Sequence, residues 1–320
     1  MIFIWIFPFK NGNLFFNTPL DSAFEALRIY KKVLGEHVYT AVAYMDIGSA
    51  YDKQGKYRKA LKYYFKALAI LLKDSSENHS VIIVAYNDIG RIYDKLGEYE
   101  KALEFLFKSL KISEKTLGKE HPSTAISYNN IGAVYDSQAK YEKALVYYFK
   151  ALKIFEKILG EKDPHTALSY NNIGLVYFNQ KEYEKALKYH FKALKILRKV
   201  LGDEHPHTAT SYNNIGLVYN GQDEYEIGLW YYFKSLKILE KVLGKKHPLT
   251  ASSYNNIGVT YYHLKNYKKA KGYLLKAVSI REKVLGEDHP DTKSSYYWLS
   301  MIYKALGDTK KANDYKKKSE

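Results

Sequence analysis

The sequence predicts an all-α solenoid of stacked helix pairs, and a regular repeat is the first observation behind this prediction. The pentapeptide Tyr-Asn-Asn-Ile-Gly begins at Tyr128, Tyr170, Tyr212 and Tyr254, so each copy follows the previous one by 42 residues. A fixed period of roughly 20–50 residues is typical of stacked supersecondary units. The second observation is a helical spacing of apolar residues within each period, and the third is that no strand pattern is present. Each repeat of such a chain buries its apolar face on its neighbours.

The unit that begins at Pro122 shows the expected helix pair. Proline is favoured at the first position of a helix, because the N–H that it lacks has no partner there. We expect a first helix over residues 122–136 and, after a short polar break, a second helix over residues 141–159. Gly160 then ends the pair, since glycine readily adopts the left-handed backbone that follows a helix. The same Leu-Gly pair closes other units, at Leu117-Gly118, Leu201-Gly202, Leu243-Gly244 and Leu285-Gly286.

Small residues recur at fixed places in both helices. Glycine in the middle of a helix costs ~1 kcal/mol relative to alanine, so its recurrence needs a reason. It is found in the first helices at Gly48, Gly90, Gly132, Gly174, Gly216 and Gly258. Alanines stand in the second helices at Ala60, Ala102, Ala144, Ala186 and Ala270. We predict that the two helices of a pair approach closely at these positions.

These residues resemble the tetratricopeptide repeat. The resemblance rests on the small positions together with the aromatic residues Tyr128, Tyr135, Tyr141 and Tyr148. The 42-residue unit, the Leu-Gly…His-Pro-x-Thr-Ala junction and the Asn-Asn pair resemble the kinesin light chain and nephrocystin branch of that family. The resemblance covers residues 16–320. It implies a right-handed superhelix whose first helices line a concave groove.

The chain divides into three parts on this interpretation. Residues 1–15 form an apolar segment outside the repeat, residues 16–36 match only the second helix of a unit, and residues 37–320 form seven units with a polar C-terminal cap. The apolar start is far shorter than the ~20 residues that a membrane span requires, so we expect no membrane span. The chain has no cysteine, which fits a reducing compartment, and we expect a cytoplasmic protein.

The sequence contains no motif for catalysis. There is no cysteine, no Gly-x-Ser-x-Gly nucleophile turn and no phosphate-binding loop, so we expect neither an enzyme nor a cofactor. Histidines precede proline at His121, His205, His247 and His289, one repeat or more apart. Metal ligands must converge on one ion, so we interpret these histidines as helix-entry residues and expect no metal site. Asp163 takes the same place in the remaining junction, and aspartate is a good N-cap.

The first asparagine of each pair is the main candidate for ligand binding. These residues are Asn87, Asn129, Asn171, Asn213 and Asn255. The resemblance implies that their position faces the groove. An amide both donates and accepts, so a row of amides suits the backbone of an extended peptide. The alternative is that these asparagines tie neighbouring helices together. For the second asparagine of each pair the two interpretations have equal support.

Neighbouring positions predict a graded groove. One turn after the asparagines the sequence has Arg91, Ala133, Leu175, Leu217 and Val259. A further turn brings the acidic residues Asp94 and Asp136 in the early units and the aromatic residues Phe178 and Tyr262 in the later ones. We therefore expect the ligand to be an extended segment. Its basic residues would contact units one to three, and its apolar residues would contact units four to six.

The sequence thus predicts a non-enzymatic protein-interaction scaffold whose partner is a protein or peptide, with no small-molecule substrate. One alternative is a cargo adaptor of kinesin light chain type, and another is the sensing region of a larger signalling protein. The formal charge of +16 comes almost wholly from lysine, whereas readers of nucleic acid usually rely on arginine. Binding to RNA or a membrane surface is accordingly the least favoured alternative.

Overall fold

The computed structural model describes residues 19–73 and 78–320, and every regular element in these two ranges is an α-helix. The expected apolar segment, residues 1–15, lies outside the described residues, as does the start of the expected half unit. Helix α1 (Pro19–Leu34) is the part of the half unit that the structure describes. It packs against the helix that follows it.

Seven helix pairs follow α1 in the described chain. Their first helices are α2 (Val38–Lys53), α4 (His79–Lys95), α6 (Pro122–Ser137), α8 (Pro164–Asn179), α10 (Pro206–Gly221), α12 (Pro248–His263) and α14 (Pro290–Ala305). Their second helices are α3 (Tyr57–Lys73), α5 (Tyr99–Thr116), α7 (Tyr141–Ile158), α9 (Tyr183–Leu201), α11 (Tyr225–Val242), α13 (Tyr267–Val284) and α15 (Thr309–Ser319). We number the pairs as units one to seven.

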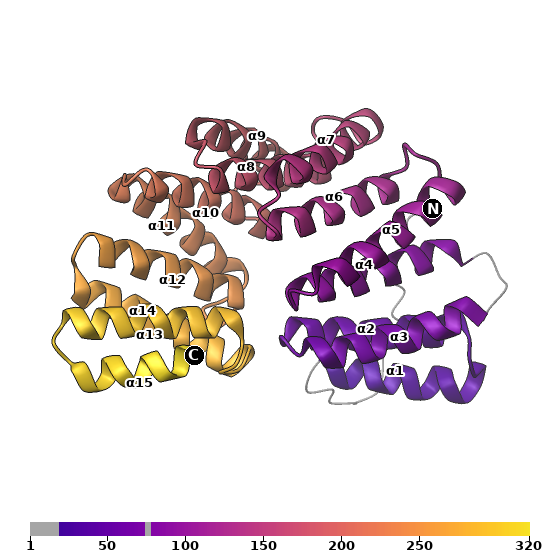
Figure 1. Ribbon diagram of the computed structural model, residues 1–320, viewed down its shortest axis with the longest axis horizontal. Helices are drawn as coiled ribbons and strands as arrows, with labels where there is room; N and C mark the ends of the chain where they lie inside the picture. Colours follow the sequence, from indigo (N-terminus) through magenta and orange to yellow (C-terminus); the bar gives the residue numbers. More distant parts are fainter. Residues whose placement is uncertain (1–18, 74–77) are drawn as a thin grey trace.

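The pairs stack into a right-handed superhelical solenoid, as predicted (Figure 1). Each first helix packs on its own second helix and also on the first helix of the next unit. In the described chain successive first helices approach each other more closely than successive second helices, which meet through edge-on ring pairs such as Phe149 and Tyr189. The first helices therefore form the inner layer and the second helices the outer layer. The array curves until its indigo and yellow ends face each other (Figure 1).

The recurrent glycines allow the close approach that the sequence predicts. A Cβ atom on Gly132 would lie 2.9 Å from Cδ1 of Tyr148 in the paired helix. A Cβ atom on Gly258 would lie 2.7 Å from Cγ of Leu274 and 3.2 Å from the carbonyl oxygen of Ala270. These gaps are too small for a methyl group, so only glycine permits this spacing.

The unit junctions are built from side chains that cap the first helices. Nδ1 of His121 accepts the backbone N–H of Ser123 at 3.1 Å, and Oδ1 of Asp163 accepts that of His165 at 2.7 Å. The hydroxyl of Thr124 donates to the carbonyl of Gly118 at 2.8 Å and ties the junction to the preceding unit. The helix-entry role predicted for these histidines and for the aspartate is therefore confirmed.

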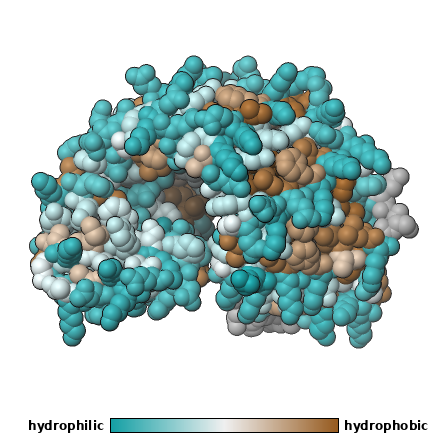
Figure 2. Space-filling model, in the orientation of Figure 1, coloured by the Kyte–Doolittle hydropathy of each residue, from teal (hydrophilic) through white to brown (hydrophobic). Residues whose placement is uncertain are grey.

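The abundant lysines and tyrosines are used together on the outer layer. Nζ of Lys150 lies 5.5 Å from the ring centroid of Tyr128 and 5.2 Å from that of Tyr147. Lys192 and Lys276 repeat this arrangement one and three units later. Each ammonium group therefore packs on aromatic faces of the array. Figure 2 shows hydrophilic residues over much of the outer rim of the molecule.

Candidate peptide-binding groove

The inner layer presents a repeated row of exposed positions, which we call the concave stripe. On α8 the stripe consists of Leu168, Asn172, Leu175 and Asn179, spaced three or four residues apart and all at least partly exposed. It lies on the side of the helix away from Gly174, which packs against the second helix. The corresponding positions of the other six units complete the stripe, and they are exposed or partly exposed except for the buried Asn214.

The concave stripe changes character along the array. In units one and two it carries the charged residues Asp46, Lys53, Asp88, Arg91 and Lys95. In units four to seven the third position of the stripe is apolar, at Leu175, Leu217, Val259 and Met301. Figure 2 shows the molecule hollowed between its two ends. The charged residues of the stripe are thus concentrated in units one and two, and its third position is apolar in units four to seven.

The first asparagine of each pair lies beside the stripe, in the seam between neighbouring first helices. Asn171 is only 4% exposed; its Nδ2 donates to Oγ of Ser211 in the next unit at 2.9 Å, and its Oδ1 lies 3.0 Å from Nδ1 of His190. Asn87 donates to Ser127 at 3.3 Å and accepts from Asn130 at 3.1 Å. Both amides are therefore used to hold consecutive units together.

The remaining three first asparagines make similar bonds. Asn129 donates to Ser169 at 3.5 Å, Oδ1 of Asn213 accepts from Asn256 at 3.0 Å, and Oδ1 of Asn255 accepts from Ser295 at 2.8 Å. All five thus make the inter-helix tie that the sequence left open as their alternative role. Contact between these residues and a peptide stays a prediction. Asn129 and Asn213 are the two that keep partial exposure.

The second asparagine of the pair is the one on the concave stripe. Asn130, Asn172 and Asn256 are partly exposed there, whereas Asn214 is buried. One residue along a helix of 3.6 residues per turn is a rotation of about 100°, enough to move a side chain from the seam to the exposed face. The sequence pattern alone does not show which asparagine takes which place.

The predicted acidic positions lie next to each other in units two and three. Burial raises the pKa of the Asp94 carboxyl, and burial together with the nearby Asp94 charge raises that of Asp136. Asp136 accepts from Nδ2 of Asn179 at 3.1 Å. In the described chain neither carboxylate has a cationic side chain within ion-pair distance, whereas Asp52 is paired with Lys95 at 2.6 Å. The two unpaired carboxylates therefore form a patch suited to a cationic side chain.

The predicted aromatic positions contact the helices that follow them. Phe178 lies against Tyr183, with ring centroids 6.0 Å apart. Tyr262 lies 5.6 Å from both Tyr267 and Trp298, edge-on to the latter. Trp298 occupies the stripe position that asparagine holds in units three to six, and the sequence interpretation did not single it out as a groove residue. The tryptophan in place of the usual asparagine was the feature of the sequence that could have identified Trp298 as a groove residue.

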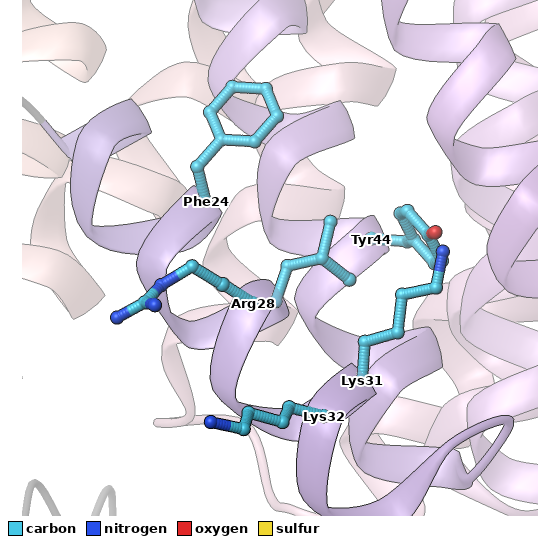
Figure 3. A pocket seen from close by; sticks show the side chains of 6 residues that line it. Phe24, Arg28, Lys31, Lys32 and Tyr44 are labelled. Carbon is cyan, nitrogen blue, oxygen red and sulfur yellow. The ribbon is translucent and has the colours of Figure 1, made fainter.

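A shallow pocket at the N-terminal end is separate from this groove (Figure 3). It lies on α1 and α2 and is lined by Phe24, Leu27, Arg28, Lys31, Lys32 and Tyr44. None of the predicted groove residues contributes to it. Within residues 19–73 and 78–320, no group of acidic or histidine side chains has the geometry of a metal site. Nor is any helix in these ranges long and apolar enough to cross a membrane.

Solved structures with a similar backbone are numerous. The apo form of the quorum sensor NprR from B. thuringiensis is 19% identical with a TM-score of 0.65, covering 94% of this chain and 81% of that chain. A Rap protein complexed with Competence and Sporulation Factor is 19% identical with a TM-score of 0.61, covering 94% of this chain and 76% of that chain. BtubC (BKLC) from P. vanneervenii is 22% identical with a TM-score of 0.56, covering 70% of this chain and 89% of that chain. At these identities the likeness concerns the fold.

Comparison with curated proteins finds no match. Models of the tetratricopeptide repeat, in contrast, match most of the sequence. One matches residues 25–73, 80–157 and 165–227, a second matches residues 208–249 and 250–291, and a third matches residues 294–318. The repeat models and the helix-pair architecture together support a protein-interaction scaffold. The chain belongs to the tetratricopeptide repeat family.

Proposed function

We propose that this protein is a non-enzymatic scaffold that binds an extended peptide segment along the concave stripe. The observation that carries the proposal is the row of partly exposed amides at Asn130, Asn172 and Asn256, one on the inner face of each of three first helices. An amide side chain can pair with both the N–H and the C=O of an extended backbone. Nδ2 of Asn130 and of Asn256 each donates one N–H to a seam asparagine, which leaves the second N–H and the carbonyl oxygen for the ligand. Such pairing gives affinity with modest dependence on the side chains of the ligand.

The carboxylates of Asp94 and Asp136, which lie one residue before stripe positions, support a preferred composition of the ligand. Asp94 and Asp136 have no cationic partner in the described chain, and burial raises the pKa of both. A basic side chain placed beside them would stabilise their ionised forms. The apolar positions Leu175, Leu217 and Val259 would contact hydrophobic side chains further along the segment. We propose basic residues at units one to three and apolar residues at units four to six.

The first asparagines have a supporting role in this proposal. By joining neighbouring first helices they fix the spacing of the exposed amides, and Asn129 and Asn213 keep enough exposure for a direct contact with the ligand. Two of the similar structures are the quorum sensor NprR and a Rap protein complexed with Competence and Sporulation Factor. Their names agree with a ligand-binding use of the fold. The alternatives are that the same groove serves a cargo adaptor, or that it belongs to the sensing region of a larger signalling protein.

Two adjacent residues of α8 provide a matched test. Asn172→Ala removes an exposed amide of the stripe, and Asn171→Ala removes a buried seam amide in the same turn. We expect Asn172→Ala to weaken binding to an array of extended peptides several-fold and to leave the thermal unfolding midpoint nearly unchanged. We expect Asn171→Ala to lower the midpoint, because it leaves Ser211 and His190 without their buried partner.

The combined variant Asn130→Ala/Asn172→Ala/Asn256→Ala sharpens the result. If it retains the peptides as well as the wild-type protein does, the concave stripe is not the ligand-binding surface. The variant Asn129→Ala/Asn171→Ala/Asn213→Ala tests the seam asparagines in the same assay. Peptide recovery should be compared only between variants whose far-ultraviolet circular dichroism matches that of the wild type.

A further inference from the structure

Arg281 is a buried cation without an anionic partner. It lies on the second helix of unit six and is only 5% exposed. The same place in four other units is occupied by an apolar residue, Leu71, Phe155, Leu197 or Leu239, and in one by Ser113. Burying an uncompensated charge is costly, so this exception to an apolar position requires an explanation.

The contacts of the guanidinium group show which of its donors are engaged. Nη1 lies 2.7 Å from the carbonyl oxygen of Asp291, 2.7 Å from Oγ of Ser295 and 3.3 Å from Oδ1 of Asn255. Nη2 lies 3.3 Å from Oγ of Ser252. Nε has no hydrogen-bond partner. All four acceptors are neutral oxygens, and in the described chain no carboxylate lies within ion-pair distance of this arginine.

The edge of the guanidinium formed by Nε and Nη2 is the one that lacks an anion. Two exposed arginines of this chain show how that edge is normally used. Arg198 donates from Nε and Nη2 to the carboxylate of Asp203, and Arg28 donates from the same two atoms to Glu25. Such side-on pairs have a planar, two-bond geometry that matches a carboxylate. At Arg281 the same edge holds one hydroxyl and one unsatisfied N–H.

This edge is itself buried, and a partly exposed hydroxyl of the concave stripe covers it. Ser252, which accepts from Nη2, is the first stripe position of α12 and is partly exposed. The equivalent stripe positions of the flanking units are Thr210 and Ser294, also hydroxyl-bearing, whereas units one to four have Val42, Val84, Ile126 and Leu168 there. Units five to seven thus carry hydroxyl groups at this position of the stripe, and in unit six the hydroxyl accepts from a buried guanidinium.

We propose that Arg281 and Ser252 form a subsite for a carboxylate of the bound segment. A carboxylate displacing the Ser252 hydroxyl from the guanidinium edge would accept from Nη2 and Nε, while the hydroxyl keeps its bond to the carbonyl oxygen of Pro248. The subsite rests on the proposed function and deepens it by giving the ligand a direction. The basic residues of the ligand would lie beside Asp94 and Asp136, and its carboxylate would lie beside units six and seven. The carboxylate belongs either to the C-terminus of the ligand or to an acidic side chain.

The test uses two variants of the full chain that each remove one positive charge. Arg281→Leu introduces leucine, the residue that unit four has at the equivalent position, Leu197. Unit four keeps its seam with leucine there, because Asn171 still donates to Ser211. Arg198→Leu removes an exposed arginine and serves as the control. The probes are three N-acetylated octapeptide libraries: one with a free C-terminus and no acidic residue, one amidated with acidic residues, and one amidated without them.

We expect the wild-type protein and Arg198→Leu to retain one carboxylate-bearing library at least about tenfold better than the neutral one. Arg281→Leu should lose this preference and retain the neutral library as the wild type does. Whichever carboxylate library is favoured identifies the source of the anion. If the wild-type protein binds all three libraries equally, the subsite is wrong while the proposed function stands.

Two further measurements keep the outcomes separate. If no library binds, the proposed function fails, and the subsite is then judged by thermal shift with succinate against succinamide at equal ionic strength. Succinate should raise the melting temperature of the wild type and not of Arg281→Leu; an equal response overturns the subsite. If Arg281→Leu does not fold, Arg281→Lys replaces it, because lysine keeps the charge but lacks the two-donor edge. Unchanged carboxylate preference in Arg281→Lys would then contradict the proposal.

Discussion

Tyr57 and His289 are 232 positions apart in the sequence, yet Oη of Tyr57 lies 3.2 Å from Nε2 of His289. The histidine caps α14 by accepting the N–H of Asp291 at Nδ1, so Nε2 carries the proton and donates to the tyrosine. Gly55 permits the approach, because a Cβ there would lie 2.3 Å from Cδ2 of His289. The seven units therefore close on themselves, and this contact joins the first unit to the last junction.

Removal of the tyrosine hydroxyl should loosen this closure. A single hydrogen bond contributes about 1 kcal/mol, so Tyr57→Phe should increase the population with separated ends several-fold. Because the chain has no cysteine, spin labels at Arg58→Cys and Lys283→Cys report the end-to-end distance by pulsed electron paramagnetic resonance. Tyr99→Phe, the same position one unit later, is the control. An unchanged distance distribution in Tyr57→Phe would show that packing elsewhere holds the ends together.

Two glycines of unit six should respond in opposite ways to alanine. Gly258→Ala places a methyl group 2.7 Å from Leu274, and overpacking of this kind costs about 1–3 kcal/mol. A methyl group on Gly272, in α13, would meet no neighbouring atom within 4 Å, so Gly272→Ala should stabilise by up to ~1 kcal/mol through helix propensity. Denaturant midpoints measure both changes. Equal destabilisation by the two variants would contradict the close-approach explanation.

His190 should make the protein sensitive to mild acid. It is fully buried beneath Gly174, and burial lowers its pKa to about 4. As the pH falls from about 6.5 to 4, the unfolded chain binds a proton that the folded chain does not. The free energy of unfolding should therefore fall by about 3 kcal/mol across this window and be unaffected by this group above pH 7.

His190→Leu provides the comparison for this pH dependence, since Leu106 and Leu274 occupy the same place in other units. Denaturant midpoints recorded from pH 7.5 to 4 should decline less steeply in the variant than in the wild type. Parallel declines would assign the acid sensitivity to other groups. Asp88 does not account for such a decline: burial raises its pKa to about 6, so its protonation increases the free energy of unfolding as the pH falls.

The outer lysines should contribute to stability more than to polyanion binding. Lys150 lies over Tyr128 and Tyr147, so Lys150→Met should cost about 0.5–1 kcal/mol. Retention of the wild-type protein on heparin should be weak and should disappear at moderate salt. Strong retention that several such lysine variants abolish would favour the nucleic-acid alternative over the peptide-binding groove.

Much of the fold was predictable because its determinants are local and repeated. The proline after His121, the glycine at Gly160 and the small residue at Gly132 each act within one unit or between immediate neighbours. The same local contacts then recur in each repeat along the chain. The candidate groove was predictable to within one helical position, since the Asn-Asn pair marked the inner face but not which asparagine is exposed on it.

The sequence by itself determined the helix pairs, their junctions and their stacking. Only the tertiary structure decided that Asn171 lies in a seam while Asn172 is partly exposed, that Arg281 is buried without an anion, and that Tyr57 meets His289. The physical reason is that the first two relationships depend on packing between neighbouring helices, and the third depends on the small rotation between successive units. That rotation is set by packing across each interface and accumulates over seven units, so no single repeat contains it.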